Sequence, residues 1–289
     1  MIAVVETKDE IRSAVAEARA DGSTVGFVPT MGALHEGHLS LVRAARTRYD
    51  VVVASIFVNP TQFGPGEDFE RYPRRIEADS ELLAGAGAKL VWTPRVAEMY
   101  AADAQVTVDP GPLATRWEGE IRPGHFSGVA TIVTKLLSVV RPDAAFFGEK
   151  DYQQLAIVRR LACDLDLGVE IVGCPIVRDQ DGLALSSRNA YLSPAERAAG
   201  LALPHALWAA ASELMLGERD ARVIEKAMRA AARAHAGDAI ALDYAALVDP
   251  HTLEPLDTIT GPARAIIAGR VGTTRLIDNI ELLAVTPQG

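Results

Sequence analysis

Two histidines, His35 and His38, stand where a tight glycine turn leads from an apolar run into a helix-like pattern. They form the sequence His-Glu-Gly-His, which is one residue too short for the zinc protease pattern H-E-x-x-H. Gly32 and Gly37 have the spacing of a Walker phosphate loop, but His38-Leu39 stands where that loop needs Lys and then Ser or Thr. The dinucleotide pattern G-x-G-x-x-G is also absent.

A strand-to-helix turn of this kind directs unpaired main-chain N–H groups and a positive helix dipole beyond the end of the strand. Gly37 allows a nucleotide to approach the main chain closely, and the two imidazoles can donate hydrogen bonds to phosphate oxygens. We therefore expect this turn to bind a phosphate chain. The alternative is a pair of surface histidines that only cap a helix.

A second group of polar residues, Gly148-Glu149-Lys150-Asp151, follows the apolar run 144–147 directly. Ligands of open parallel sheets bind at the carboxyl ends of the strands. Lys150 is placed there as a cation for a triphosphate, and Asp151 could hold a ribose hydroxyl, a metal ion or Lys150. The alternative is an ordinary helix start with acidic residues in its first turn.

A third group, Leu185-Ser186-Ser187-Arg188, lies just past an expected domain boundary. Two hydroxyls beside a guanidinium make a good phosphate clamp. A linker is also a place where closure over a substrate is easy. The alternative is a polar loop with a capping serine.

Two glutamines, Gln62 and Gln154, complete the candidate site. Each amide both donates and accepts hydrogen bonds, which suits a hydroxylated carboxylate better than a phosphate. Gln154 lies one helical turn after Lys150, on the same face of the expected helix. The alternative for either glutamine is a solvated side chain.

Four other residues could assist Mg-ATP but are expected to be structural, namely Arg122, His125, Glu77 and Asp79.

Alternating strands and helices must position these groups. The pattern predicts strands at 25–29, 51–58, 89–93, 144–147 and 169–174. It predicts helices at 8–20, from the histidine motif to about Tyr49, around 75–87, and at 128–140 and 151–165. This alternation is typical of right-handed βαβ units, so we expect an α/β fold with a Rossmann-like parallel sheet and flanking helices.

The C-terminal part of the chain has a different pattern. Residues 194–236 read as alanine-rich helix with a break near Gly217-Glu218, and strands are expected at 240–249, 263–270 and 274–285. We therefore expect two domains, residues 1–176 and a smaller α+β domain, residues 177–289, with a short antiparallel sheet.

Composition excludes several classes of protein. The 289-residue chain has a formal net charge of −9, so it has no general electrostatic reason to bind nucleic acid. It has no apolar run long enough to span a membrane and no visible signal peptide, so we expect a cytoplasmic protein. Cys163 and Cys174 are expected to be small buried apolar residues.

The chain shows no Ser-His-Asp order, no metal-spaced set of Cys and His, and no context for a cofactor lysine. We therefore expect no covalent enzyme intermediate, and we assign no protein residue as a metal ligand. The site instead gathers positive charge from two histidines, Lys150, Arg188, a helix terminus and Mg²⁺.

The pattern H-x-G-H, followed far downstream by a flexible Ser/Lys/Arg loop, resembles the nucleotidylyl-transferase superfamily. More narrowly, the four segments 29–38, 57–63, 148–154 and 185–189 resemble the pantothenate synthetase (pantoate–β-alanine ligase) family. The resemblance covers the whole length, although the last hundred residues match mainly in size and pattern. It implies that pantoate reacts with ATP to give pantoyl adenylate, and that β-alanine then displaces AMP to form pantothenate.

The resemblance also implies roles for individual residues. His38, His35, Lys150 and Arg188 would be catalytic, and Gln62 and Gln154 would bind pantoate, with Gln62 near the β-alanine site. ATP would be held by Met31, Gly32, Ala33, Leu34, His35, Glu36, Gly37, His38, Gly148, Glu149, Lys150, Asp151, Val177, Leu185, Ser186, Ser187 and Arg188.

The family resemblance further implies Mg²⁺ with the ATP and a homodimer. Residues 1–176 would bind ATP and pantoate, and residues 177–289 would form a lid near the dimer contact. Two other functions stay open from the residues alone: a nucleotidyltransferase that stops at the nucleotide product, and a non-catalytic nucleotide-binding module.

Overall fold

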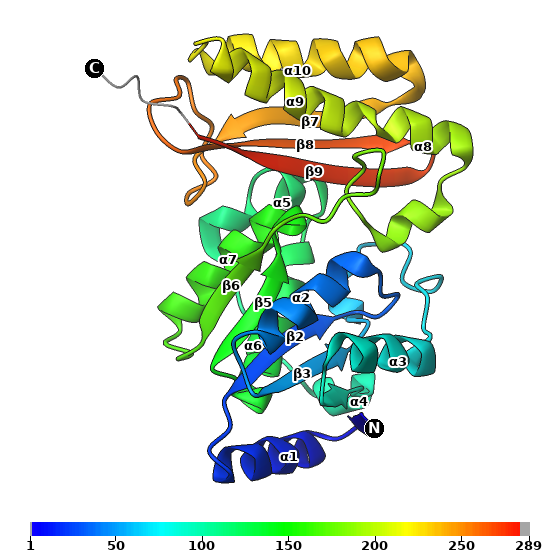
Figure 1. Cartoon of the computed structure of the whole chain (residues 1–289), viewed down its shortest axis with the longest axis vertical. Helices are drawn as coiled ribbons and strands as arrows, with labels where there is room; N and C mark the ends of the chain where they lie inside the picture. The colour runs from blue at the N-terminus through cyan, green and yellow to red at the C-terminus, as the bar shows by residue number, and fades with distance from the viewer. Residues whose placement is uncertain (1, 284–289) are drawn as a thin grey trace. The chain divides into compact units, whose positions relative to one another are not determined.

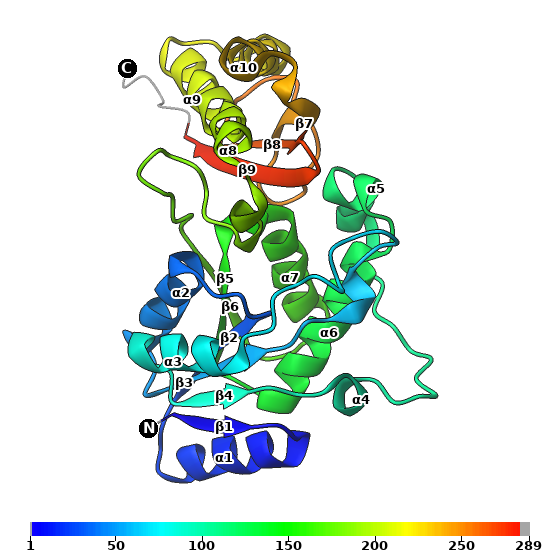
Figure 2. The same ribbon diagram turned by 90° about the vertical axis from the view of Figure 1, so that its right-hand side faces the viewer.

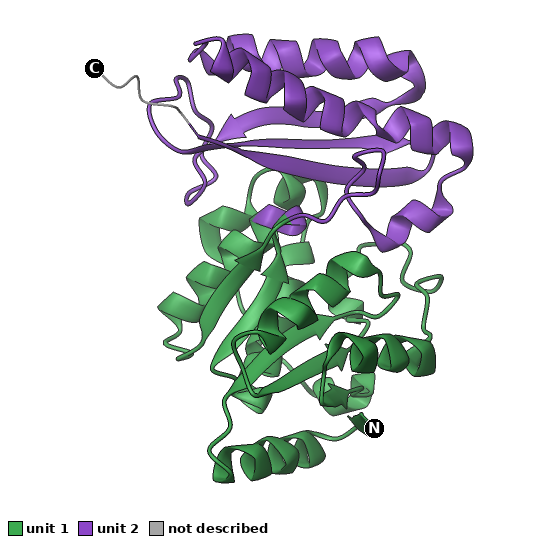
Figure 3. Ribbon diagram, viewed as in Figure 1, with its two compact units in different colours: residues 1–149, 153–175 green, residues 150–152, 176–289 purple. Residues whose placement is uncertain are grey.

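The computed structural model describes residues 2–283 and divides into two compact units. Unit 1 comprises the chain up to Glu149 together with Gln153–Pro175. Unit 2 comprises Lys150–Tyr152 and the chain from Ile176 onward (Figure 3). Three residues from the middle of the sequence therefore belong to the same unit as the C-terminal part.

Unit 1 is built on a six-stranded sheet in which every paired strand is parallel. Its strands are β1 (Ala3–Val5), β2 (Val25–Thr30), β3 (Val51–Ile56), β4 (Leu90–Trp92), β5 (Ala144–Gly148) and β6 (Glu170–Cys174). The strand order is β1-β4-β3-β2-β5-β6. The expected parallel sheet is therefore confirmed, with β1 as an edge strand that the sequence pattern did not predict.

Helices cover both faces of this sheet (Figure 2). The longer ones are α1 (Lys8–Ala20), α2 (Glu36–Arg46), α3 (Ile76–Ala86), α6 (His125–Val140) and α7 (Tyr152–Asp164), and the single-turn ones are α4 (Val96–Met99) and α5 (Glu118–Ile121). On the α2–α3 face, Val42 and Leu83 share a core with strand residues such as Val52 and Phe146. Both faces of the central strands are thus buried, which explains their continuous apolar runs.

The order of the strands reverses between β2 and β5. From β2 the chain continues to β3 and β4 on one side, whereas β5 pairs with the other side of β2, with Gly26 opposite Ala144. In open parallel sheets, ligands bind outside the carboxyl ends of the strands at such a switch point. The turn with the two histidines follows β2, and Gly148 ends β5. The fold therefore brings two of the predicted motifs to neighbouring strand ends.

Unit 2 contains an antiparallel sheet packed against helices (Figure 1). The strands are β7 (Ala241–Val248), β8 (Ala263–Val271) and β9 (Thr274–Leu282), and the helices are α8 (Pro194–Gly200), α9 (Ala202–Met215) and α10 (Ala221–Ala236). Buried residues of α9, including Leu203 and Leu207, share one core with Ala265 and Ile267 of β8. The expected small antiparallel sheet is confirmed; residues 284–285 of its predicted last strand lie outside the described residues.

The alanine-rich region 194–236 breaks in two places, whereas one break was expected. The additional break is at Leu201, between α8 and α9. Pro204 explains it, because proline lacks an N–H and its ring would clash with the main-chain carbonyl of Gly200 in an uninterrupted helix. In α9, Pro204 lies in the first turn, where the missing N–H costs little.

The two cysteines differ in exposure. Cys174 is buried, as expected, but Cys163 is exposed on α7, so its predicted burial is wrong; both cysteines are free thiols.

Within residues 2–283, we find no helix that is both long and apolar enough to cross a membrane.

Candidate active site

The turn after β2 has a main-chain conformation that depends on glycine and on a buried carboxylate. Gly32 and Ala33 have φ angles of 81° and 51°, in the left-handed region. Asp79 of α3 is 3% exposed and accepts hydrogen bonds from the N–H groups of Ala33 (2.9 Å) and Leu34 (3.0 Å). A Cβ on Gly32 would lie 2.9 Å from the Asp79 Oδ2 atom, so only glycine fits there. Asp79 is therefore structural, as the sequence suggested.

The two histidines cap α2 reciprocally. His35 is the N-cap residue, and its Nδ1 atom accepts a hydrogen bond from the N–H of Gly37 at 3.1 Å. The Nδ1 atom of His38 accepts one from the N–H of His35 at 3.4 Å. The ring centroids are 4.1 Å apart. An Nδ1 atom that accepts carries no proton, so the capping bonds place the proton of each neutral ring on Nε2.

This arrangement corrects one part of the sequence analysis. We expected unpaired N–H groups at the start of α2, but those of His35 and Gly37 donate to imidazole nitrogens. The histidines do cap the helix, which was the alternative interpretation. Capping leaves the Nε2–H group of each half-buried ring as its donor, so phosphate recognition and capping are compatible.

Gln62 lies beside the histidine turn within unit 1. It ends a single 3-10 turn, Pro60–Gln62, that follows β3. Its Nε2 atom is 3.0 Å from the sulfur of Met31, and its Oε1 atom accepts from Asn59 at 3.1 Å. Asn59 is buried and also donates to the carbonyl of Gly128 on α6. Gln62 is therefore half-buried, and its side chain is held by neighbouring residues.

A charged cluster holds the main chain of Gln62. The Nδ1–H of His125 donates to the carbonyl of Gln62 at 2.7 Å, and Arg122 donates to the same oxygen at 3.3 Å. Arg122 also makes a two-point ion pair with Glu67, at 2.7 and 2.6 Å. Arg122 and His125 were expected to be structural, but no local sequence pattern links them to Gln62, which lies about 60 positions away.

The cluster of Arg122, His125 and Glu67 also shifts the pKa values of His125 and Glu67. Burial and then the positive charge of Arg122 lower the pKa of His125 to about 4. Its Nε2 atom lies 3.0 Å from an Arg122 nitrogen, so it accepts while Nδ1–H donates. Burial would raise the pKa of Glu67, but the hydrogen bonds and charge of Arg122 outweigh it and lower that pKa.

The two glutamines of α7 have different environments. Gln153 is buried and donates to the carbonyls of Leu113 (2.7 Å) and Arg116 (2.9 Å), while its oxygen accepts from the N–H of Glu118 (3.0 Å). It ties the irregular segment before α6 to α7. Gln154 is only half-buried. This difference supports Gln154, and not Gln153, as the candidate ligand-binding residue.

Unit 1 also contains the predicted residues Gly148 and Glu149, whereas unit 2 carries Lys150, Asp151, Val177 and Leu185–Arg188. The Nζ atom of Lys150 is 3.7 Å from Asp151, so Asp151 pairs with Lys150 as one of the three options allowed. The N–H of Leu185 donates to the carbonyl of Val177 at 2.9 Å, which brings two predicted ATP contacts together. Ser186 caps the 3-10 turn Ser187–Tyr191 by accepting from the N–H of Arg188. The capping-serine alternative for this loop is thus observed.

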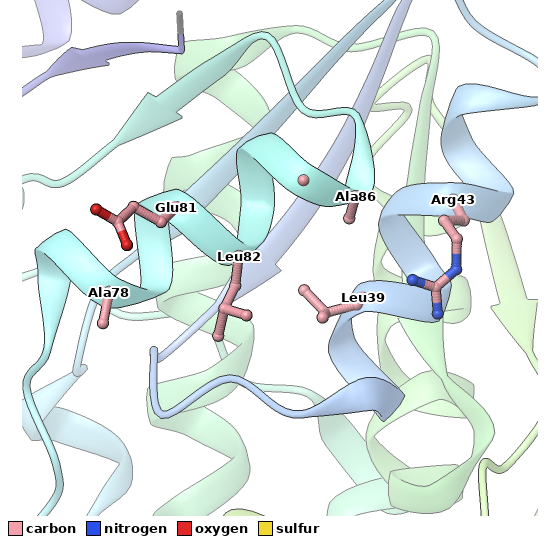
Figure 4. Close-up of a pocket in the computed structure, with 7 residues that line it drawn as sticks. Leu39, Arg43, Ala78, Glu81, Leu82 and Ala86 are labelled. Carbon is pink, nitrogen blue, oxygen red and sulfur yellow. The ribbon is translucent and has the colours of Figure 1, made fainter.

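A separate surface groove lies between α2 and α3 and has a volume of about 520 Å³ (Figure 4). Leu39 projects from α2, and Leu82 belongs to the facing part of α3. The other lining residues are Arg43, Ala78, Glu81, Gly85 and Ala86. The lining contains none of the predicted site residues, so we do not assign the chemistry to this groove.

Residues 2–283 contain no group of three or more His, Cys, Asp or Glu side chains that could hold a metal ion. Mg²⁺ usually keeps several waters and binds through one or two carboxylates plus substrate phosphates. A magnesium ion that arrives with its nucleotide does not require such a group.

Comparisons with known proteins agree with this geometry. The sequence profile described as pantoate-beta-alanine ligase matches residues 3–281. The chain belongs to the pantoate–β-alanine ligase family. The pantothenate synthetase of Rhizorhabdus wittichii is 55% identical over 98% of this chain and 99% of its own length, and that of Rubrobacter xylanophilus is 55% identical over 94% and 96%.

Solved structures show the same relationship. The crystal structure of the Thermus thermophilus pantothenate synthetase matches with a TM-score of 0.91 at 49% identity, over 96% of this chain and 99% of that one. The Francisella tularensis pantoate-beta-alanine ligase, described as complexed with beta-gamma ATP and beta-alanine, matches with a TM-score of 0.77 at 31% identity over the full length of both. The predicted family and fold class are thus confirmed, and this pantoate–β-alanine ligase family member is a ligase.

Proposed function

We propose that the chain joins (R)-pantoate to β-alanine at the expense of ATP, through a pantoyl adenylate. A pantoate carboxylate oxygen attacks the α-phosphorus of ATP, and the bond to the β-phosphate oxygen breaks to release pyrophosphate. The β-alanine amine then attacks the acyl carbon, loses a proton and displaces AMP. The observation that carries this proposal is the pair of motifs at the β2 and β5 strand ends, flanking the switch point of the sheet.

The histidine pair acts on the phosphates as hydrogen-bond donors. Capping places the proton on Nε2 of His35 and His38, so each ring offers one N–H to a phosphate oxygen. Negative charge on the nucleotide rises as the carboxylate attacks, so donors aimed at that point stabilise the transition state more than the ground state. A well-placed donor contributes roughly 2.7–4 kcal/mol on the oxyanion-hole precedent. His38 is the proton donor that we assign first.

Lys150 and Arg188 supply the positive charge. Both belong to unit 2, together with Ser186 and Ser187, whose hydroxyls can donate to phosphate oxygens. The remaining ATP contacts in this proposal come from main-chain and side-chain groups of Met31–His38, Gly148–Asp151, Val177 and Leu185. Cover by residues 177–289 would protect the adenylate from water, since an acyl phosphate hydrolyses readily.

Gln62 and Gln154 bind pantoate. Each amide can donate to the carboxylate and accept from the hydroxyls of this acid. Three observations support Gln62: the sulfur contact with Met31 of the histidine turn, the bond from Asn59, and the main-chain bonds from His125 and Arg122.

Gln154→Ala should raise the KM for pantoate more than the KM for ATP. The opposite order would remove Gln154 from the pantoate-binding residues.

Three further properties follow from the family resemblance and form part of the proposal. Mg²⁺ accompanies ATP and neutralises phosphate charge, the active protein is a homodimer, and it works in the cytoplasm. Sedimentation equilibrium should give twice the chain mass at micromolar concentration. A monomer mass with full activity would remove the dimer from the proposal.

Two assays test the reaction. ATP–pyrophosphate exchange should depend on pantoate and should occur without β-alanine, because the adenylate forms first. AMP release from ATP and pantoate should be slow alone and fast once β-alanine is added. Equal AMP release with and without β-alanine would exclude amide formation, and absence of pantoate-dependent exchange would exclude the adenylate.

A further inference from the structure

Lys150 is held by the sheet of unit 2. The side-chain Nδ2 group of Asn279 on β9 donates to the main-chain carbonyl of Lys150 at 2.9 Å. Two residues later, the hydroxyl of Tyr152 donates to the carbonyl of Pro250 at 3.0 Å. The guanidinium of Arg264 on β8 lies 3.6 Å from the centre of the Tyr152 ring, a cation–π contact. Three contacts thus hold the segment Lys150–Tyr152 against the C-terminal part of unit 2.

Asn279 is oriented for this bond. Its side chain is 2% exposed, and its Oδ1 atom accepts a hydrogen bond from Arg264 at 2.6 Å. Arg264 is itself only 4% exposed. A guanidinium can only donate and a carbonyl oxygen can only accept, so the amide oxygen must face Arg264 and the amide nitrogen must face Lys150. The amide has a single orientation, and it can make both bonds.

The residue before Asn279 holds a second segment. Asp278 is 3% exposed and receives two bonds from Arg178, at 2.6 and 2.9 Å. Arg178 follows Val177 directly, and Arg178 also donates to the main-chain carbonyl of Asn279 at 3.4 Å. Two adjacent residues of β9 therefore hold two predicted ATP contacts. Asn279 binds the carbonyl of Lys150 directly, and Asp278 binds Arg178, the residue after Val177.

We propose that Asn279 is a positioning residue that sets the place of Lys150 for catalysis. The inference rests on the proposed function, because it requires that Lys150 contacts the reacting phosphates. Lysine is a point charge on a flexible four-carbon stem, so the location of its main chain decides where the charge can reach. A displacement of about 1 Å at a reacting group can cost about a hundredfold in rate.

The substitution Asn279→Asp separates the two bonds of Asn279. A carboxylate can still accept from Arg264, so the buried pair persists, but it cannot donate to the carbonyl of Lys150. We expect kcat to fall at least about tenfold, with the KM for pantoate within about twofold of the wild type. Asn279→Ala, which removes both bonds, should give a similar kcat loss and a lower melting temperature.

A matched control lies on the same sheet. Arg275 of β9 forms an ion pair with Asp243 of β7 at 2.7 Å, and both side chains are mostly buried. Asp243→Asn should lower the melting temperature and leave kcat within about twofold. A comparable kcat loss in this control would show that any disturbance of the sheet slows the enzyme, and would overturn the positioning role.

The decisive measurement is a double-mutant cycle with Lys150→Ala. If Asn279 acts through Lys150, adding Asn279→Asp to Lys150→Ala should change kcat by less than about twofold. A further tenfold loss in the double variant would overturn the inference, as would wild-type kcat in Asn279→Asp alone. If Lys150→Ala itself keeps wild-type turnover, the role of Lys150 in the proposed function fails instead, which the single variant reveals.

Discussion

His35 and His38 cap α2 through their Nδ1 atoms, and this has a consequence for how they can help with phosphate chemistry. A protonated imidazole has no acceptor nitrogen, so a ring that carries two protons cannot cap. From the sequence, both histidines were expected to be among the cations of the site. With the capping bonds in place they are neutral donors, and the positive side-chain charge comes from Lys150 and Arg188.

Two substitutions separate the capping role of His38 from its catalytic role. His38→Ala removes both, whereas His38→Gln keeps a side chain that can accept from the N-cap N–H, as glutamine does at this position in capping boxes. We expect kcat to fall at least about a hundredfold in both variants, with a loss of about 1 kcal/mol in unfolding free energy only for alanine. Steady-state kinetics and urea unfolding measure these two effects.

The comparison between the variants decides the outcome. If His38→Gln restores turnover to near the wild-type level, His38 acts only as a cap and is not a catalytic residue. If both variants lose turnover while His38→Gln unfolds like the wild type, the imidazole itself is required.

His125 gives the protein a pH-dependent stability. Its pKa is about 4 in the folded chain and about 6.5 when unfolded, so the unfolded state binds more protons between these values. The contribution is fully present above pH 6.5 and is lost as the pH falls toward 4, up to about 3 kcal/mol. His125→Asn keeps a donor near the Nδ1 position but does not titrate, so urea unfolding at pH 7 and pH 5 should show a smaller loss for it. An equal loss in both proteins would contradict the role of His125.

At the scale of elements, α3 holds the turn that follows β2. Asp79→Ala would leave the N–H groups of Ala33 and Leu34 without their acceptor, which should lower the unfolding free energy by about 2 kcal/mol or more and raise the KM for ATP. Asp50→Ala is the matched control, because exposed Asp50 makes a similar bond to the N–H of Thr24. It should cost less than about 1 kcal/mol and leave the KM for ATP unchanged. Equal effects would show that the α3 contact has no special importance.

Local sequence patterns were sufficient for most elements. The helix expected at 8–20 is α1, Lys8–Ala20, because a capping box of Thr7 and Glu10 begins it and Ile11 and Val15 give it a buried face. The runs that became β2, β3 and β5 were predicted because strands buried on both faces read as continuous apolar runs. β1 was missed because three residues, two of them exposed, carry no periodicity, and its partner β4 is nearly ninety residues away.

The candidate site was predictable where its residues are neighbours in sequence, as in the histidine turn. The supporting contacts were not, because they join residues that no local pattern connects. Asp79 binds Ala33 across 46 positions, and Asn279 binds Lys150 across 129. Sequence alone could mark Asp79, Arg122 and His125 as charged residues of interest, but the fold was needed to show what each one holds.

At the scale of the whole molecule, each unit has its own hydrophobic core. Leu207 on α9 is 1% exposed, so Leu207→Ala should lower the unfolding free energy by about 2–5 kcal/mol. Met215, at the end of the same helix, is 83% exposed, and Met215→Ala should change it by less than about 0.5 kcal/mol. Below the melting temperature, Leu207→Ala should not alter the KM for pantoate, because Gln62 and Gln154 lie in unit 1. A raised KM would contradict that division of roles.

The segment Lys150–Tyr152 makes unit 2 discontinuous along the chain. A fragment beginning at Ile176 would carry Arg264 and Asn279 without the aromatic ring and the carbonyl group that these two buried side chains bind. A chimera that exchanges only the residues after β6 between two relatives would therefore join side chains from one parent to a segment from the other. Exchanging Lys150–Tyr152 together with the C-terminal part keeps those contacts within one parental sequence.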